Sequence, residues 1–348
     1  MKKIKVGING FGRIGRVFLK IAWERPEIEI VAVNDLSDVA NMGYLLKHDT
    51  AYGEWKHPVR VEVSNGTGDN YIVIDENKRV KVLAEKNPKL LPWKDLGIDV
   101  VVESTGLFVT YEQSKMHLEA GAKKVVISAP AKDGDGTVMG ETILLGVNEN
   151  KFGTCDVTSN ASCTTNAASP LIAILDEGLG IEKALLNTVH ALTNSQPTVD
   201  SINKHNMREG RAGGHNIVPT SSGSAIAVTK AFPKLEGLFD GIAMRVPMIV
   251  GSIADVTFIS KKNTTPQEVN EILKNAAKDK RWKGVFSVTE EELVSSDIIG
   301  SSYGCIADLG LTRVVGGNLV KVMGWYDNEM GYTYTLVEHV IKTGNTIV

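Results

Sequence analysis

The first 35 residues of this 348-residue chain constrain its fold more tightly than any other segment. An apolar run at 4–9 leads directly into a G-x-G-x-x-G motif at 10–15, and a helical pattern follows that stops near Pro26. A second apolar run occupies 28–33. Glycines at the three motif positions permit a tight turn, let backbone approach a pyrophosphate and allow a helix to pack closely on a sheet. The segment therefore predicts a strand–helix–strand unit that binds a dinucleotide.

An acidic residue at the end of the second predicted strand indicates which dinucleotide this is. Asp35 follows the last glycine of the motif by 20 residues, a spacing at which a carboxylate accepts hydrogen bonds from ribose hydroxyls. Its charge repels a 2′-phosphate, so NAD is favoured over NADP. The alternative is a glycine-rich turn without a ligand.

The same alternation of strands and helices continues to residue 130. Apolar runs at 100–102 and 124–128 flank a helical pattern at 111–120, which is typical of a parallel sheet covered on both faces. Ligands bind at the carboxyl ends of such strands. Thr105 and Ser128 are therefore candidate cofactor neighbours, although either could simply form a turn.

The remaining segments predict less parallel structure. Residues 55–84 alternate as in antiparallel strands, with a turn signal at Asn65-Gly66. A capping box at Thr265 opens a helix that extends to about 278, and strand patterns occupy 255–260 and 319–325. The fold class expected is α/β: a Rossmann dinucleotide-binding domain plus an α+β catalytic domain with a mixed, largely antiparallel sheet.

Cys163 is the strongest candidate for covalent chemistry. It stands among small polar residues, just before an apolar helical stretch at 167–175. A helix N-terminus favours thiolate over thiol, and thiolate is the nucleophile. His190 follows 27 residues later at the end of a predicted strand, where it could serve as the general base. The alternatives are a structural core cysteine and a core histidine.

Two features of the second half suit anions. Residues 193–224 are unusually polar and glycine-rich, and they include Ser222-Gly223. Hydroxyl groups beside a glycine suit a phosphate, and Arg245 could clamp one with its planar guanidinium. A structural salt bridge is the alternative for Arg245.

Composition excludes several other classes. The net charge is −3 without a long basic tract, so no nucleic-acid partner is indicated. The three cysteines match no zinc pattern and predict a reducing compartment. No run of 18 apolar residues occurs, so no membrane partner is indicated and a cytoplasmic protein is expected.

Taken in order, these motifs resemble those of phosphorylating glyceraldehyde-3-phosphate dehydrogenases along nearly the whole chain. The segments that carry the resemblance are GINGFGRIGR (7–16), ESTG (103–106), ISAP (127–130), NASCTTN (160–166), TVHALT (188–193), NIVPTSSG (216–223), MRVP (244–247) and WYDNEMGY (325–332). The resemblance implies an NAD-binding domain at 1–162 with 331–348, a catalytic domain at 163–330 and a homotetramer. It also implies glyceraldehyde 3-phosphate and inorganic phosphate as substrates.

The resemblance assigns roles to individual residues. Cys163 is implied to be the nucleophile that forms a thioester, and His190 the base that activates it. Thr193 and Arg245 are implied to bind the phosphate of the substrate. The implied site for the attacking phosphate is made by Ser162, Thr164, Ser222 and Gly223, with Arg211 as a neighbour. Cofactor positions are Arg13, Ile14, Asp35, Lys86, Ser128, Asn194 and Asn328, beside Gly10, Gly12 and Thr105.

Two departures from the family pattern matter. A cysteine often found four residues after the nucleophile is Ala167 here, so Cys163 has no neighbouring thiol. Ile202 replaces a proline that helps to exclude NADP, while Asp35 still disfavours it. The alternatives to the leading function are an erythrose-4-phosphate dehydrogenase and a non-catalytic NAD-binding regulator.

Overall fold

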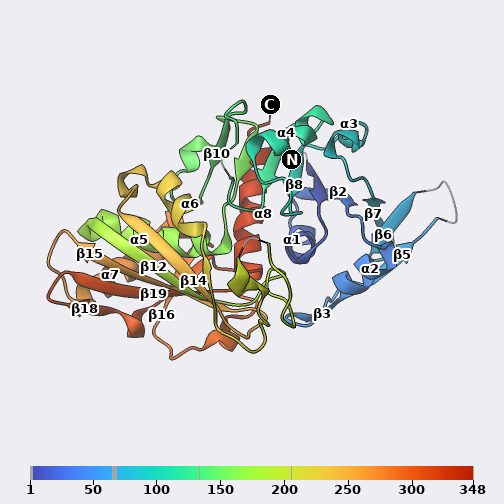
Figure 1. Ribbon diagram of the computed structural model, residues 1–348. Helices are drawn as coiled ribbons and strands as arrows, with labels where there is room; N and C mark the ends of the chain where they lie inside the picture. Colours follow the sequence, from blue (N-terminus) through green and yellow to red (C-terminus); the bar gives the residue numbers. More distant parts are fainter. Residues whose placement is uncertain (1–2, 65–68, 133, 205, 348) are drawn as a thin grey trace. The chain divides into compact units, whose positions relative to one another are not determined.

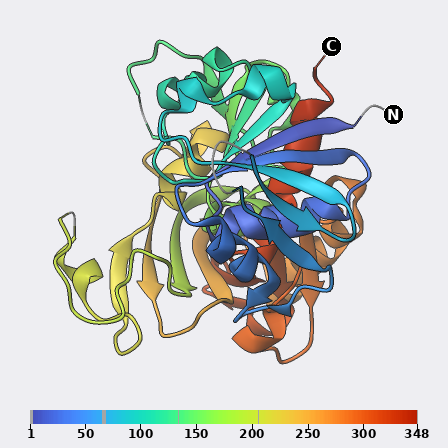
Figure 2. The ribbon, with the colours of Figure 1, turned by 90° about the vertical axis from the view of Figure 1, so that its right-hand side faces the viewer.

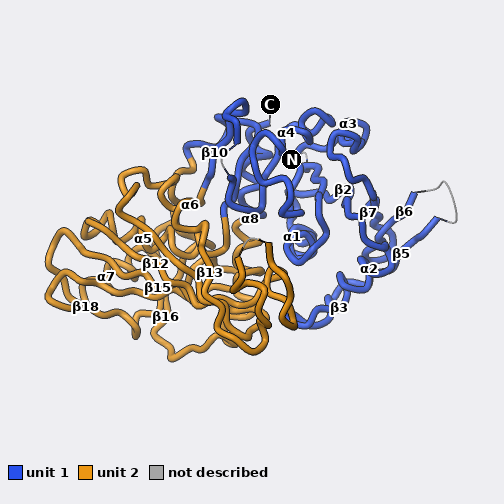
Figure 3. The backbone as a smooth tube through the Cα atoms, in the orientation of Figure 1, with its two compact units in different colours: residues 1–143, 150–161, 336–348 blue, residues 144–149, 162–335 orange. Residues whose placement is uncertain are grey.

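The computed structural model describes residues 3–64, 69–132, 134–204 and 206–347. The chain divides into two compact units (Figure 3). The first contains residues 1–143, 150–161 and 336–348, and the second contains 144–149 and 162–335. Compared with the boundaries expected from the sequence, residues 144–149, 162 and 331–335 lie in the second unit instead of the first. The turn expected at Asn65-Gly66 lies outside the described residues.

The first unit is built on a nine-stranded sheet of order β10-β11-β9-β8-β1-β2-β7-β6-β5 (Figures 1 and 2). All neighbours from β10 to β7 are parallel, whereas β6 pairs antiparallel with β7 and β5. The strands are β1 Ile4–Asn9, β2 Ile28–Asn34, β5 Val59–Glu62, β6 Asn70–Ile74, β7 Lys78–Leu83, β8 Val100–Glu103, β9 Lys124–Ile127, β10 Gly140–Thr142 and β11 Val157–Ser159. A separate pair is β3 His48–Asp49 with β4 Gly53–Glu54.

Four helices accompany this sheet: α1 Arg13–Trp23, α2 Val39–Lys47, α3 Trp93–Leu96 and α4 Tyr111–Glu119. The central strands are buried runs of valine and isoleucine, as expected for strands covered on both faces. One core cluster places Trp93 and Ile98 against Val101, Val125 and Ile127. The predicted Rossmann arrangement is therefore confirmed, and its polar residues collect where the parallel strands end.

The second unit is built on an eight-stranded mixed sheet of order β13-β14-β12-β15-β19-β17-β16, with β18 also paired to β19. Only β12 with β14 and β16 with β17 are parallel pairs, so the predicted mixed and largely antiparallel sheet is confirmed. The strands are β12 Ile181–His190, β13 Val218–Ser221, β14 Phe239–Arg245, β15 Ser252–Ser260, β16 Phe286–Thr289, β17 Cys305–Asp308, β18 Arg313–Val315 and β19 Leu319–Tyr326.

The helices of the second half are α5 Cys163–Leu179, α6 Ser224–Ala231, α7 Pro266–Lys278 and α8 Met330–Gly344. Helix α5 packs on β12, β15, β17 and β19, and its buried positions fill the space between sheet and helix. The polar stretch 193–224 is not wholly a loop, because β13 begins at Val218 and α6 at Ser224. Among the described residues, no helix is both long and apolar enough to cross a membrane.

A charged cluster in the first unit joins three segments that are distant in sequence. The His57 ring lies between two carboxylates, with Nδ1 2.7 Å from Asp75 Oδ1 and Nε2 2.6 Å from Glu24 Oε1. Both partners accept hydrogen bonds only, so the ring satisfies both when it is protonated. Burial opposes the charge, but the hydrogen bonds to Asp75 and Glu24 prevail and raise the pKa of His57. In turn, His57 lowers the pKa of Glu24 and of Asp75.

We expect this cluster to make stability depend on pH. A raised histidine pKa contributes stability that is fully present below about pH 6.5, the ordinary value, and is lost as the pH rises through the folded value. The lowered carboxyl pKa values confine the contribution to the region above about pH 4. His57→Gln should therefore reduce the free energy of unfolding by about 0.5–1 kcal/mol at pH 6 and by less at pH 9. Urea unfolding at both pH values measures this.

The matched control is His48→Gln, because His48 stacks on Tyr44 without a carboxylate partner among the described contacts. It should show no such pH dependence. An equal loss of stability for His57→Gln at pH 6 and pH 9 would contradict the charge assignment.

Candidate active site

The structure brings the predicted nucleophile and base together within the second unit. Cys163 is the first residue of α5, directly after the N-cap Ser162, and it is partly exposed. His190 is the last residue of β12 and is buried. The distance from Cys163 Sγ to His190 Nε2 is 3.3 Å. Helix α5 packs on β12, so two residues that are 27 positions apart in the sequence come into direct contact.

The backbone just before the nucleophile is strained. Ala161 has φ 55°, and only one other non-glycine residue among those described, Asp75, has a positive φ. The left-handed conformation is costly for a residue with a Cβ and persists where surrounding structure enforces it. Ala161 is fully buried, and its N–H donates to Ser159 Oγ at 3.0 Å. The strained residue turns the chain from β11 (Val157–Ser159) into the helix that begins at Cys163.

Burial controls the charges of the pair. Desolvation raises the pKa of the Cys163 thiol, although the nearby Arg245 charge and Thr164 hydrogen bonds act in the opposite direction. Desolvation and the Arg245 charge together lower the pKa of His190 to about 3. Desolvation thus opposes the effect expected of the helix N-terminus, and the thiolate expectation stays a prediction. Both shifts oppose the charged forms of the pair.

Nδ1 of His190 faces two groups with opposite requirements. It lies 2.6 Å from the Ala191 carbonyl oxygen, which needs a proton on Nδ1, and 2.5 Å from Arg245 Nη1, which can only donate. Nε of Arg245 is buried without a hydrogen-bond partner. Arg245 is thus a charged donor beside the base, and it lacks a carboxylate partner among the described residues, so the salt-bridge alternative fails.

Two helix N-termini meet beside Cys163. Ser162 Oγ caps α5 by accepting from the Thr165 N–H at 3.1 Å, and it also lies 2.9 Å from Ser224 Oγ at the start of α6. Gly223 is the N-cap of α6 and offers no side chain to cap it. Backbone N–H groups and the helix dipole at such termini favour anions. The structure thus brings Ser162, Ser222 and Gly223 into one small region.

Three other predicted anion ligands lie in different surroundings. Thr193 is exposed, with its hydroxyl 2.8 Å from Ser195 Oγ. Arg211 pairs with Asp200 at 3.0 Å, and no described contact joins it to Ser222 or Arg245. The Thr164 hydroxyl is buried and bonds to Tyr326, so it faces the protein interior.

Tyr326 is a site residue that the sequence reasoning missed. Its buried hydroxyl lies 2.8 Å from both Thr164 Oγ1 and Thr188 Oγ1. One threonine adjoins Cys163 and the other precedes His190 by two residues, and the tyrosine ring lies edge-on to the His190 ring. Burial raises the pKa of Tyr326, which keeps the hydroxyl protonated. Its signals in the sequence were its place at the end of an alternating strand and within the segment WYDNEMGY.

The first unit provides a cradle that fits a dinucleotide. A Cβ at Gly10 would lie 2.6 Å from the Thr105 nitrogen, and one at Gly15 would lie 2.2 Å from the Gly10 oxygen, whereas the space above Gly12 is open. Asp35 is buried in part, but hydrogen bonds from Ser37 and from the Phe11 N–H lower its pKa. The glycine positions and a fixed carboxylate match the requirements of NAD.

The other predicted cofactor residues are placed as follows. Arg13 and Ile14 open α1, and the Arg13 guanidinium pairs with Asp49 at 2.7 Å. Thr105 and Ser128 follow β8 and β9, Lys86 is exposed after β7, and Asn194 is exposed in the second unit. Asn328 is buried, and its Oδ1 accepts from the Gly251 N–H and Ser252 Oγ.

A dinucleotide-binding fold in the first unit, with a cysteine–histidine contact and anion-binding helix N-termini in the second, is typical of an NAD-dependent oxidoreductase. The family model "Glyceraldehyde 3-phosphate dehydrogenase, NAD binding domain" matches residues 4–111, and the corresponding C-terminal domain model matches residues 162–328. The chain belongs to the glyceraldehyde-3-phosphate dehydrogenase family. It is an NAD-dependent oxidoreductase that acts on an aldehyde group.

Curated relatives support the same assignment. A glyceraldehyde-3-phosphate dehydrogenase of Streptomyces coelicolor is 47% identical over 347 residues, covering 99% of each chain. Proteins of the same name from Clostridium pasteurianum and Geobacillus stearothermophilus are 45% and 44% identical, each over 96% of both chains. The resemblance stated from sequence motifs is thereby confirmed.

Tyr326→Phe should separate the positioning of the catalytic pair from its chemistry. Removing the hydroxyl leaves Thr164 and Thr188 without their shared partner, which should lower the free energy of unfolding by about 1–2 kcal/mol. A small displacement of Cys163 relative to His190 should reduce kcat roughly tenfold. The control is Tyr334→Phe on α8, since the Tyr334 hydroxyl has no described hydrogen bond. Unchanged kcat in Tyr326→Phe would rule out the positioning role.

Proposed function

We propose that this protein oxidises glyceraldehyde 3-phosphate to 1,3-bisphosphoglycerate, with NAD and inorganic phosphate, through a thioester on Cys163. The observation that carries the proposal is the 3.3 Å contact between Cys163 Sγ and His190 Nε2 at the N-terminus of α5. The family membership supplies the substrate class. The reaction is reversible, so the same groups serve glycolysis and gluconeogenesis.

The first step forms a bond between Cys163 Sγ and the aldehyde carbon. The thiol proton moves to His190 Nε2 as sulfur attacks, so no free thiolate has to persist in the buried site. NAD supplies the hydride acceptor when bound, and loss of hydride leaves an acyl group on sulfur as a thioester. Before the hydride leaves, His190 returns the thiol proton to the alkoxide oxygen, and as the hydride leaves it takes that proton back from the hemithioacetal hydroxyl.

Arg245 links substrate binding to the state of the base. Its unpartnered Nε and its Nη1 are donors suited to the phosphate of the substrate. Thr193 stays a proposed ligand of the same phosphate. When the guanidinium turns to that phosphate, the Ala191 carbonyl remains as the partner of His190 Nδ1. The ring proton then sits on Nδ1, and the Nε2 lone pair faces Cys163. Substrate binding thereby selects the tautomer that can accept the thiol proton.

The two adjoining helix N-termini suit the attacking phosphate. Ser162, Ser222 and Gly223 present hydroxyl and backbone groups beside the sulfur atom. Phosphate oxygen attacks the thioester carbon and releases Cys163 with the acyl phosphate. We keep Thr164 and Arg211 as proposed neighbours only, because Thr164 bonds to Tyr326 and Arg211 to Asp200.

We propose the following residues as ligands of NAD. Backbone of Arg13 and Ile14 at the start of α1 would hold the pyrophosphate, and Asp35 would hold the adenosine ribose. Because Oδ1 of Asn328 is engaged by Gly251 and Ser252, its amino group is the part available to the nicotinamide carboxamide. The remaining proposed ligands are Gly10, Gly12, Lys86, Thr105, Ser128 and Asn194.

A steady-state assay tests this proposal with both aldehydes, glyceraldehyde 3-phosphate and erythrose 4-phosphate, with NAD or NADP, and with phosphate present or omitted. The wild type should prefer glyceraldehyde 3-phosphate and NAD and should require phosphate. Cys163→Ser should lose at least about a thousandfold in turnover while still binding NAD. Arg245→Leu should raise KM for the phosphorylated aldehyde, and the exposed Arg313→Leu is its control. Equal rates without phosphate would refute the phosphorylating reaction.

We also propose that the chain forms a homotetramer in the cytoplasm, where a reducing environment keeps Cys163 as a free thiol. One face of the second sheet, opposite α5, exposes apolar side chains of β12 and β14, including Leu185 at 64% and Ile242 at 49%. Hollows of about 410 and 460 Å³ lie along this face. Exposed apolar patches of this kind mark protein contacts, and a second copy of the chain is the partner we assign.

Analytical ultracentrifugation should give the wild-type mass of four chains. Leu185→Asp and Ile242→Asp place a charge in the proposed contact and should each shift the protein to smaller species. Leu90→Asp, at an equally exposed leucine of the first unit, should leave the mass unchanged. A monomeric wild type would contradict the proposal.

A further inference from the structure

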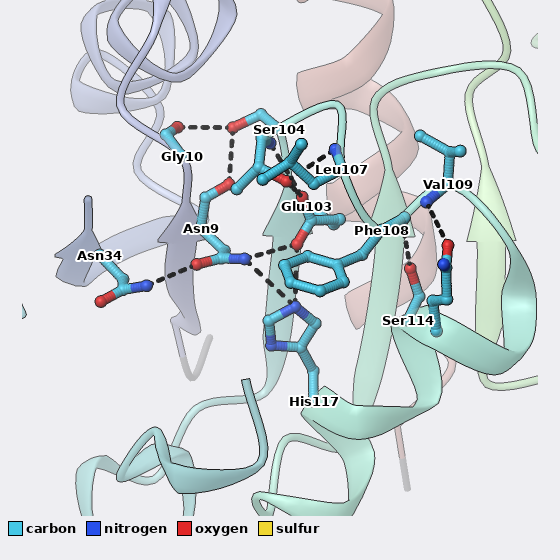
Figure 4. A network of polar contacts seen from close by, with 12 residues as sticks. Asn9, Gly10, Asn34, Glu103, Ser104, Leu107, Phe108, Val109, Ser114 and His117 are labelled. Carbon is cyan, nitrogen blue, oxygen red and sulfur yellow. Dashed lines mark hydrogen bonds and ion pairs between the residues drawn. The ribbon is translucent and has the colours of Figure 1, made fainter. Parts of the chain in front are cut away.

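Three neighbouring strands of the first unit end in buried polar residues that touch one another. Strands β2, β1 and β8 end at Asn34, Asn9 and Glu103, which are partners in the sheet register and are at most 5% exposed. Asn34 Nδ2 donates to Asn9 Oδ1 at 2.7 Å, and Asn9 Nδ2 donates to Glu103 Oε2 at 2.6 Å. Figure 4 shows this row of side chains together with His117 from α4.

Three side chains face the ring nitrogens of His117: Trp93, Glu103 and Asn9, whose Nδ2 lies 3.5 Å from Nε2. Trp93 Nε1 lies 3.0 Å from His117 Nδ1 and can only donate, so Nδ1 must accept. The ring proton therefore sits on Nε2, which donates to Glu103 Oε2 at 2.9 Å. All three side chains are buried. His117 is a neutral donor held in one tautomer.

The Glu103 carboxylate is saturated with donors and has no cation among them. Oε2 accepts from Asn9 and His117, while Oε1 accepts from the Thr105 N–H at 2.8 Å and from Thr105 Oγ1 at 2.5 Å. A buried carboxylate is costly unless such bonds satisfy it. Its position therefore dictates where the backbone of the turn after β8 must lie.

This turn holds the first glycine of the dinucleotide motif in place. Ser104 Oγ donates to the Gly10 oxygen at 2.7 Å, and its N–H donates to the Asn9 oxygen at 2.7 Å. The Thr105 nitrogen lies so close to Gly10 that a Cβ there would reach 2.6 Å. A shift of the turn would thus move Gly10 as well. Glu103 and Ser104, which make these contacts, are not among the proposed cofactor ligands.

We propose that Glu103, with the neutral His117 as its fixed donor, is a positioning residue for NAD: it locks the turn after β8 against Gly10 in the geometry that the pyrophosphate requires. The role depends on Glu103 being an acceptor of hydrogen bonds as well as on its packing. All four groups around the Glu103 carboxylate donate to it. The amino group of a glutamine at 103 would therefore face at least one other donor. This inference rests on NAD binding by the first unit.

The test is NAD affinity, measured by calorimetric titration of the full protein without aldehyde, together with the thermal midpoint of the NAD-free protein. Glu103→Gln should raise the Kd for NAD at least about tenfold, the scale of a lost hydrogen bond to a charged group. At saturating NAD its KM for glyceraldehyde 3-phosphate should stay within about twofold of wild type, since those groups lie in the other unit. The control Ser114→Ala removes a different, partly buried hydrogen bond of α4, to the Phe108 oxygen, and should leave Kd unchanged.

Two variants at His117 distinguish loss of the hydrogen bond to Glu103 from loss of the imidazole ring. They also test the positioning role if Glu103→Gln does not fold. His117→Gln can still donate to Glu103 from the Nε2 position, whereas His117→Asn can only replace the acceptor for Trp93. His117→Asn should bind NAD at least about threefold more weakly than His117→Gln, the lower end expected for one hydrogen bond. Equal Kd values for the two, or a folded Glu103→Gln with wild-type Kd, would overturn the proposal. Failure of the wild type to bind NAD would instead refute the cofactor assignment.

Discussion

A polar side chain buried at a strand end must find hydrogen-bond partners, and both units meet this requirement next to their functional groups. In the first unit Glu103 receives four donors and fixes the turn beside Gly10. In the second unit the Tyr326 hydroxyl joins Thr164 and Thr188, the neighbours of the nucleophile and the base. Because an unsatisfied buried group costs more than a typical hydrogen bond contributes, each network allows little variation in geometry. The groups beside each network, Gly10 in the first unit and Cys163 with His190 in the second, are therefore held in a narrow range of positions.

Burial also sets the electrostatics of the catalytic pair. A thiolate–imidazolium pair would place two charges in a poorly solvated site beside Arg245, and desolvation opposes both. Both pKa shifts therefore oppose the charged forms of the pair. Arg245 has a double effect, since its charge favours thiolate and disfavours imidazolium. A phosphate bound to Arg245 would reduce this second effect, and it would do so only when a substrate is present.

The sequence predicted the outlines of this arrangement well and its details unevenly. Strands β1, β2, β8 and β9 and helix α4 were foreseen to within a residue or two, because buried parallel strands are short apolar runs bounded by glycine and polar residues. Strand β14 and helix α6 were missed, since the polar stretch before them concealed where regular structure resumes. The strain at Ala161 could not be foreseen, because alanine carries no local signal for a left-handed conformation. Tyr326 and His117 escaped notice because an isolated tyrosine or histidine does not reveal its partners.

The sequence by itself determined which chemistry is available: three glycines and Asp35 for a dinucleotide, Cys163 as candidate nucleophile, and candidate groups for anions. These follow from local rules, in which residue type and short spacing determine backbone conformation and reactivity. Only the tertiary structure decided which candidates act together, joining Cys163 to His190 and leaving Arg211 with Asp200. It also decided the directions of the pKa shifts at Cys163 and His190. Desolvation depends on everything packed around a group, and packing brings together residues that lie far apart in the chain.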